Sequence, residues 1–425
     1  GIADVADDGQ FDNQLAFISA LSGFAAVSLE SRQLLMMQKA LLDAFIKLIA
    51  GAIDSKSPYT GGHCQRVPEL TKLLARAACE STAEPFRDFT LDDQQWEALD
   101  IASWLHDCGK VTTPEYVVDK ATKLETLYDR IHEIRMRFEV LKRDAELRYW
   151  KRRAAGEDAA GLDAAMQDEL KRLDDDFAFV AECHLGGEFM APEKVERLHR
   201  IADYDWVRTL DDRLGVSWEE RQRMERDATS PLPVTEKLLD NKVEHLIERQ
   251  AVDRLATDNP WGFRMDTPQY KYNRGELYNL EVGRGTLTEE ERYKINDHIM
   301  QTIIMLEKLP YPKHLRDVPL IAGCHHETMD GKGYPKRLSR DEMPLTARMM
   351  AIADIFEALT ASDRPYKKAK RLSEAIRIMG FMKKDRHIDP DLFELFLRSG
   401  IYQEYGRRFL QADQLDEVNV SEYLD

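Results

Sequence analysis

The sequence predicts an all-α protein. Apolar residues recur at three- and four-residue spacings through most of the chain, which is the period of a helix with one buried face. Strand signals are scarce, because no alternating run of Val, Ile, Thr or Tyr is bounded by an Asn-Gly or Asp-Gly turn. With 425 residues and 43% hydrophobic content, the chain can fill a sizeable core. We therefore expect a helical bundle with additional helical segments around it.

The net charge disfavours one class of function. Against 60 Lys and Arg stand 77 Asp and Glu, so the formal net charge is -17, which argues against a broad surface for binding DNA or RNA polymers. A nucleotide ligand would instead need a local basic pocket. The five cysteines are scattered without a CxxC pair, and no apolar run is long enough to span a bilayer. We expect a cytoplasmic protein, although the full-length protein could be anchored in a membrane upstream.

Residues 1–49 are predicted to form a long connecting helix. Apolar residues recur at helical spacing from Phe11 to Ile49, and Gly23 could divide the segment into two helices. The chain starts in this pattern without a Met, so a sensor domain is expected upstream. Two interpretations stay open for the helix. It either carries signals and forms a homodimer, or it is an ordinary packing helix.

A change of composition marks residues 135–270 as an insertion. Long charged stretches, interrupted by Gly156 and Gly161, favour two amphipathic helices in an antiparallel hairpin. The second half of the insertion is less regular and contains several prolines. Helical patterns continue from residue 271 to about 410, and residues 411–425 are expected to form a solvated tail.

The first chemical signal is the stretch HDCGK, from His106 to Lys110, at the end of an apolar helix. A neighbouring imidazole and carboxylate can bind divalent cations, and the carboxylate can bridge two of them. Lys110 lies one helical turn beyond His106 and could reach a phosphate oxygen on the same side. Taken alone, a His-Asp pair is more often structural than metal-binding.

The second signal is the stretch HHETMDGKGYP, from His325 to Pro335. Two consecutive imidazoles followed by a Gly-rich loop are hard to explain by core packing, since buried histidines need polar partners. This stretch is therefore much more specific than the His-Asp pair.

The two stretches together resemble the paired signatures of the HD-GYP family, a branch of the HD phosphohydrolases. The segment around His63 resembles the family's first metal-histidine segment, and residues 351–360 resemble the helix with its last metal aspartate. The resemblance covers roughly residues 45–130 and 275–400. It implies an HD-type helical bundle whose parts at 50–134 and 271–410 are separated by the insertion.

The resemblance implies a phosphodiesterase with two divalent metal ions, iron or manganese, acting on a cyclic dinucleotide. Cyclic di-GMP would be hydrolysed to pGpG, and further to GMP, by a hydroxide between the two ions. The implied catalytic residues are Asp107, which bridges the ions, and Lys110, which stabilises the phosphate charge. The implied metal ligands are His63, His106, Asp107, His298, His325, His326 and Asp354. The implied substrate-binding residues are Gly331, Gly333, Tyr334, Arg364 and Lys367.

Two positions of the family pattern do not match this sequence in an obvious way. The family's remaining histidine usually follows a particular Leu by eleven residues, and His298 follows Leu287 by that distance. The competitor His132 follows Leu124 by only eight residues, so we select His298. Tyr59 stands where some members carry the carboxylate of a third metal site, so two metals are expected rather than three.

Several alternatives stay open from the sequence. The substrate could be mixed cyclic GMP-AMP, because the motifs do not include base-contacting residues. A non-catalytic cyclic-dinucleotide sensor that signals to a partner is disfavoured by the complete set of candidate ligands. Cys64, Cys108 and Cys324 each adjoin a candidate ligand and are interpreted as small buried neighbours. The insertion is expected to shape the mouth of the pocket or a dimer contact without donating a metal ligand.

Overall fold

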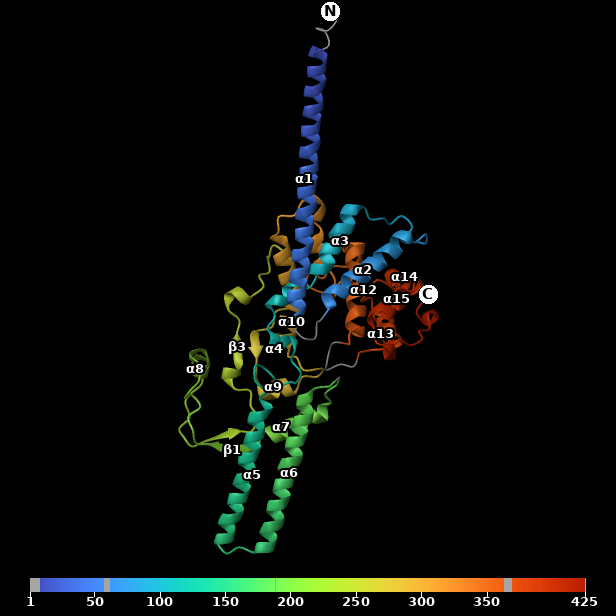
Figure 1. Ribbon diagram of the computed structural model, residues 1–425. Coiled ribbons are helices and arrows are strands. Elements are labelled where there is room, and N and C mark those ends of the chain that lie inside the picture. Colours follow the sequence, from blue (N-terminus) through green and yellow to red (C-terminus); the bar gives the residue numbers. More distant parts are fainter. Residues whose placement is uncertain (1–7, 57–61, 188, 363–368, 425) are drawn as a thin grey trace, which may run out of the picture.

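The computed structural model describes residues 8–56, 62–187, 189–362 and 369–424 (Figure 1). Helices dominate these residues, which confirms the prediction of an all-α fold. Four short strands were not predicted. A helical body occupies the centre, one long helix projects from it at one end, and a helical hairpin projects at the other (Figure 1).

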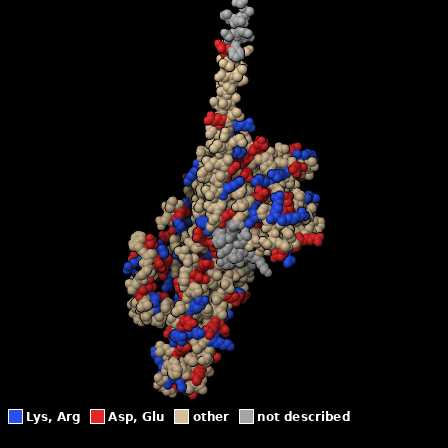
Figure 2. Space-filling model, viewed as in Figure 1, with Lys and Arg blue, Asp and Glu red and all other residues tan. Residues whose placement is uncertain are grey.

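Helix α1 (Asp8–Asp54) is a single continuous helix, so Gly23 does not break it. Its last turns join the body, where Ile46, Ala50 and Ile53 are buried. From residue 12 to residue 45 every side chain is exposed, although many are large and apolar. Figure 2 shows this part of α1 almost free of charged side chains, whereas blue and red are interspersed over the body. Among the described helices, none is long and apolar enough to cross a membrane.

The body is built around one large buried apolar cluster that joins the end of α1 to helices from both ends of the chain. Side-chain caps fix where two of these helices begin. Asp92 and Gln95 form a capping box at the start of α3, and Thr288 and Glu291 form one at the start of α10. The elements are α2 (His63–Glu80), α3 (Asp93–Leu105), η1 (Cys108–Thr112), α4 (Glu115–Val118), α10 (Glu289–Glu307), η4 (Lys313–Leu315), α11 (Val318–Gly323), η5 (Arg340–Glu342), α12 (Leu345–Thr360), α13 (Leu372–Lys384), α14 (Pro390–Arg398) and α15 (Ile401–Phe409).

The insertion begins with the predicted hairpin. Helices α5 (Ile131–Ala154) and α6 (Ala159–Leu185) pack side by side, and Asp158 caps the start of α6. The hairpin shares a separate buried cluster with α7 (Pro192–Ala202) and α9 (Glu276–Leu280). The other helical elements that follow the hairpin are α8 (Trp218–Met224), η2 (Val243–His245) and η3 (Ala251–Asp253).

The insertion is not entirely helical, which corrects the prediction. Strands β1 (Asp205–Arg208) and β2 (Val234–Lys237) form one antiparallel pair. Strands β3 (Leu246–Glu248) and β4 (Tyr270–Asn273) form a second. Each strand has only three or four residues, which is too short for an alternating pattern to stand out in the sequence.

The C-terminal segment is also different from the expectation. Residues 411–425 were predicted to be a solvated tail, yet residues 411–424 include η6 (Ala412–Gln414) and η7 (Val420–Glu422), and Gln414 is buried. Its side chain donates to the carbonyl oxygens of Thr360 (2.8 Å) and Lys370 (3.0 Å). Because these bonds satisfy backbone groups at the end of α12 and shortly before α13, the segment is anchored to the body.

Candidate metal centre

Seven side chains singled out from the sequence converge in the body. They come from the start of α2, the turn after α3, the middle of α10, the turn after α11, and α12. They form three overlapping groups whose ligand atoms lie within 4.8 Å of one another, and six of the seven residues are buried while His326 is half-buried. The seven are His63, His106, Asp107, His298, His325, His326 and Asp354.

Asp107 lies at the centre of this cluster and presents its two oxygens to different histidines. Oδ2 is 3.1 Å from Nε2 of His63 and 3.3 Å from Nε2 of His106. Oδ1 is 3.2 Å from Nε2 of His298 and 3.9 Å from Nε2 of His325. One carboxylate therefore separates two ligand groups, which is the arrangement needed to bridge two cations.

The remaining two residues complete one group each. Asp354 lies on the first side, where Oδ1 is 3.3 Å from Nε2 of His63. His326 lies on the second side, with its ring 5.2 Å from that of His298 and 4.2 Å from that of His325. Tyr334 stacks on His326, with the ring centroids 4.9 Å apart and the planes inclined by 23°.

Three of the histidines are oriented in the same way by the backbone. Nδ1 of His106 donates to the carbonyl oxygen of Ser103 (2.7 Å). In the same way, Nδ1 of His298 donates to the carbonyl oxygen of Ile295 (2.5 Å), and Nδ1 of His325 to that of Ala322 (2.7 Å). A carbonyl oxygen can only accept, so Nδ1 carries the hydrogen. Nε2 is left with its lone pair directed at the centre, the form of imidazole that binds metal ions.

His63 is oriented by a carboxylate instead. Its Nδ1 is bonded to the fully buried Glu357, which Arg66 holds through contacts of 2.6 and 2.7 Å. The sequence reasoning assigned no role to Glu357. A signal was present, because Glu357 follows Asp354 by three residues and therefore lies beside it on α12.

The electrostatics differ between the members of the cluster. Burial tends to raise the pKa of Asp107, but Lys110 and His106 hold it well below its usual range. Burial likewise tends to lower the pKa of His63, yet Glu357 and the two aspartates raise it. Burial lowers the pKa of His325 to about 4. The cluster thus contains an anionic Asp107 and a neutral His325, whereas the surrounding carboxylates favour the protonated form of His63.

Three buried atoms of the cluster lack a hydrogen-bond partner among the described residues: Asp107 Oδ1, His298 Nε2 and His325 Nε2. A buried polar atom without a partner costs about 1–3 kcal/mol, so native structures rarely leave several together. The three atoms lie close together, since Asp107 Oδ1 is 3.2 Å from His298 Nε2 and 3.9 Å from His325 Nε2. The cluster therefore fits divalent metal ions, which would satisfy these atoms.

Gly109 explains how the turn after α3 reaches α10. A Cβ atom on Gly109 would lie 1.9 Å from the carbonyl oxygen of His298 and 2.6 Å from the backbone nitrogen of Thr302. Its own N–H donates to Oγ1 of the buried Thr302 (2.9 Å). Any side chain here would push the turn away from α10, and with it Asp107 away from His298.

The Gly-rich loop after His326 is closed by a second buried carboxylate. Glu327 accepts hydrogen bonds from the backbone nitrogens of Lys336 (2.7 Å) and Leu338 (2.9 Å). Gly333 packs so closely that a Cβ atom would lie 2.4 Å from Cα of Glu327. Gly331 has a φ of 74°, in the region that favours glycine. These constraints hold Tyr334 over His326.

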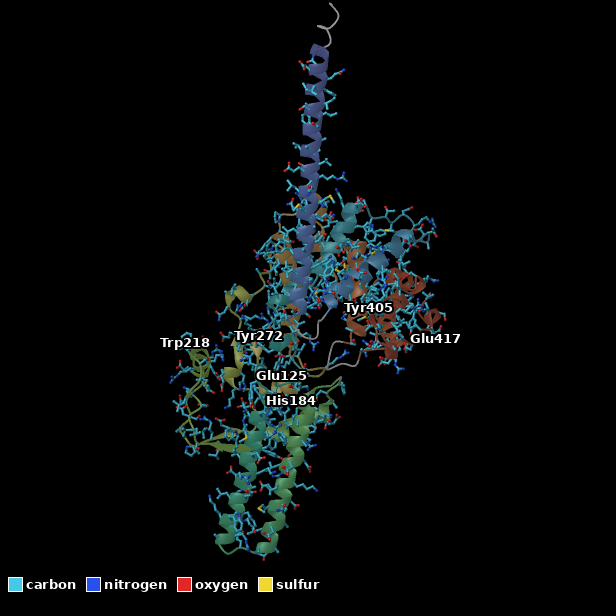
Figure 3. All side chains as sticks on the ribbon, viewed as in Figure 1. Glu125, His184, Trp218, Tyr272, Tyr405 and Glu417 are labelled. Carbon is cyan, nitrogen blue, oxygen red and sulfur yellow. The ribbon has the colours of Figure 1, made fainter. Side chains whose placement is uncertain are left out.

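The insertion touches this loop but adds no histidine to the cluster. The backbone N–H of Arg264 donates to the carbonyl oxygen of Pro335 (2.7 Å), and Asp266 pairs with Arg337 (2.6 Å). His132 is exposed on α5 and contacts Arg135, so it lies outside the cluster. His184 pairs with Asp129 at the base of the hairpin, where Figure 3 shows it beside the labelled Glu125.

Lys110 is also at the centre, where its ammonium is paired with Asp107. The neighbouring thiols are buried, and burial raises the pKa of Cys108 to about 11 and that of Cys324 to about 12. They therefore stay protonated near neutral pH, in agreement with their interpretation as small buried neighbours. Three residues considered from the sequence, Tyr59, Arg364 and Lys367, lie outside the described residues.

Comparison with known proteins agrees with the geometry. The HD domain family matches residues 233–392, which include His298 and Asp354. Over 95 residues, 22% of each chain, the sequence is 47% identical to a cyclic di-GMP phosphodiesterase of Pseudomonas aeruginosa. Both matches support the HD-GYP family for this chain.

The names of other similar proteins include a second substrate. The chain is 38% identical over 111 residues (26% of this chain, 23% of the relative) to a 3'3'-cGAMP-specific phosphodiesterase of Vibrio cholerae. It is 27% identical over 199 residues (45% and 52%) to the cyclic di-GMP phosphodiesterase response regulator RpfG of Xanthomonas campestris. The chain thus spans at most about half the length of these relatives.

The Glu357 contact gives a testable prediction. In Glu357→Gln the side chain keeps its size but loses the negative charge that orients His63, so metal affinity should fall roughly 10- to 100-fold. Isothermal titration of the metal-free protein with manganese would measure this change. Glu374→Gln, an exposed capping residue on α13, is the matched control and should bind like the wild type. Equal affinity for both variants would contradict the role assigned to Glu357.

Proposed function

We propose that this protein is a metal-dependent phosphodiesterase that hydrolyses cyclic di-GMP to pGpG, and further to GMP. The observation that carries the proposal is the placement of Asp107, with one oxygen 3.1 Å from His63 and the other 3.2 Å from His298. A carboxylate between two histidine groups supports a two-metal centre, and such centres catalyse displacement at phosphorus. The named activities of the relatives support the substrate class.

Two metal ions would be held by two ligand groups that share Asp107. His63, His106 and Asp354 would complete the first group, and His298, His325 and His326 the second. Imidazole and carboxylate ligands suit iron or manganese, which are the ions we propose. When bound, two such ions lower the pKa of water and balance the negative charge of a phosphate.

Lys110 would act on the phosphate directly. Burial lowers the pKa of Lys110, but Asp107 and Asp354 outweigh this effect and raise it, so the ammonium stays charged. A fixed cation beside the reacting phosphate stabilises the additional negative charge that develops in the transition state. We assign catalytic roles to Asp107 and Lys110 on this basis.

The Gly-rich loop would bind the substrate beside the metals. Gly331 and Gly333 keep its backbone close to Glu327, and Tyr334 presents its ring next to His326. We propose that these three residues contact the dinucleotide, together with Arg364 and Lys367, which we retain from the sequence. Mixed cyclic GMP-AMP is the second candidate substrate, because three relatives from Vibrio cholerae carry that specificity in their names.

Assays of the purified chain with a panel of cyclic dinucleotides would test the proposal. Cyclic di-GMP should be hydrolysed to pGpG by protein that contains two metal ions per chain. Asp107→Ala should lose metal and turnover together, because both ligand groups depend on this carboxylate. Metal content by mass spectrometry and product analysis by chromatography are the measurements. Three fully occupied metal positions, or an active Asp107→Ala variant, would refute the assignment.

Lys110 should affect turnover more than metal binding. Lys110→Ala is expected to keep both metal ions and to lower kcat by roughly 100-fold, the usual loss for one group that stabilises transition-state charge. Lys110→Arg retains the charge and should keep more activity than the alanine variant. An unchanged kcat in Lys110→Ala would make Lys110 a structural residue.

We propose further that α1 forms a homodimer with a second copy of the chain, in response to an upstream sensor domain. Leu34, Met37, Leu41, Ala44 and Leu48 follow the alternating three- and four-residue spacing of a coiled coil. The four larger side chains are 58 to 66% exposed, so this seam is uncovered in the single chain: Leu34 59%, Met37 62%, Leu41 58% and Leu48 66%. A parallel pair of α1 helices would bury it symmetrically.

Disrupting the seam should separate the dimer. Leu41→Glu places a charge in the middle of the proposed contact, so it should shift the chain to a monomer in sedimentation or light-scattering measurements. Leu185→Glu is the matched control, because Leu185 is similarly exposed (66%) at the end of α6. A wild-type monomer at micromolar concentration, or equal masses for the two variants, would contradict the proposal.

A further inference from the structure

We propose that Asp54 and Lys56, at the end of α1, are positioning residues that hold two parts of the metal centre in place. This inference rests on the proposed function of that centre. Asp54 holds the start of the segment that carries His63. Lys56 holds the turn that carries Asp107 and Lys110. The orientation of α1 is thereby coupled to the geometry of the catalytic site.

Lys56 binds the HDCGK turn through backbone groups alone. Its ammonium donates to the carbonyl oxygens of Lys110 (3.2 Å), Val111 (2.6 Å) and Thr113 (2.5 Å). Lys110 and Val111 lie in η1 and Thr113 caps its end, and the Lys110 carbonyl also accepts from the backbone N–H of Thr113 (3.1 Å). A cation is favourable at this end because the helix dipole is negative there. Lys56 therefore fixes the path of the chain directly after Asp107.

Asp54 binds the other segment. Its carboxylate accepts hydrogen bonds from the backbone nitrogens of Gly62 (3.2 Å) and Cys64 (3.3 Å), the residues on either side of His63. Asp54 is buried, so these bonds are poorly screened by water. The carboxylate also lies at the start of α2, where the free N–H groups favour a negative charge.

The two contacts act on atoms that meet at the centre. Nε2 of His63 and Oδ2 of Asp107 are 3.1 Å apart. The segments that carry them are held by Asp54, the last residue of α1, and by Lys56 in the turn that follows. The opposing ligands His298 and His325 are carried by α10 and the turn after α11. A rotation or shift of the last turn of α1 would therefore move one side of the centre relative to the other.

The rest of α1 is suited to transmit such a movement. The helix is continuous from Asp8 to Asp54, and its side chains are buried only near its end, from Ile46 onward. A contact made anywhere along the exposed part would act on a rigid element that ends at Asp54 and Lys56. A contact on the exposed part of α1 would therefore change the positions of His63 and Asp107.

Substitution of Lys56 in the full chain tests the inference. Lys56→Met keeps the length of the side chain but removes the three hydrogen bonds. We expect kcat to fall at least tenfold with KM changed less than twofold, and the electron paramagnetic resonance spectrum of the manganese-loaded protein to change. Lys47→Met is the control, because Lys47 lies on the same helix over the Trp104 ring, 5.8 Å from its centroid. It should resemble the wild type in kcat and spectrum.

Variants of Asp54 test the second contact independently of Lys56. Asp54→Asn, which retains an acceptor oxygen but loses the charge, should change the spectrum less than Asp54→Ala. Lys56→Met and Lys47→Met with the same kcat and spectrum, or equal effects of the two Asp54 variants, would overturn the inference. If wild-type protein hydrolyses no cyclic dinucleotide, the proposed function fails, and the manganese spectrum alone decides whether Asp54 and Lys56 position the centre.

Discussion

The carboxylate of Asp107 is the point on which the rest of the structure depends. Its two oxygens face separate histidine groups, so a small displacement would break one side of the centre. The close approach of Gly109 to α10 prevents such a displacement from one direction, and the ion pair with Lys110 restrains the carboxylate itself. Lys56 adds a further restraint on Asp107, because its ammonium binds backbone carbonyl oxygens that follow Asp107 in the chain. Helix ends, and not helix middles, supply most of these restraints.

Burying this many ionisable groups is costly unless each has a defined partner. The structure meets that requirement with outer contacts that differ between the histidines. Three imidazoles donate to carbonyls of their own helical turns, which need no additional side chain. His63 stands at the first position of α2 and uses the side chain of Glu357 instead.

The sequence predicted the parts of the site that are local and missed those that depend on tertiary structure. HDCGK and HHETMDGKGYP are short local motifs, so the family resemblance that they carry implied the ligands, and the family's spacing from Leu287 selected His298 over the exposed His132. Glu357 and Lys56 are ordinary charged residues in sequence, and only packing brings them to His63 and to the HDCGK turn. The four short strands and the anchored C-terminal segment were missed for the same reason, since neither has enough length for a periodic pattern.

The order of the ligands along the chain has a consequence for folding. His63 and Glu357 are separated by 294 positions, and Gly109 and Thr302 by 193. Contacts this distant in sequence close large loops, which costs conformational entropy and slows folding. The insertion has its own buried cluster, so it can become compact first and bring the ends of the loop nearer together. The centre then forms only after α12 has been synthesised, so any stabilisation by bound cations favours the completed chain over its partly folded precursors.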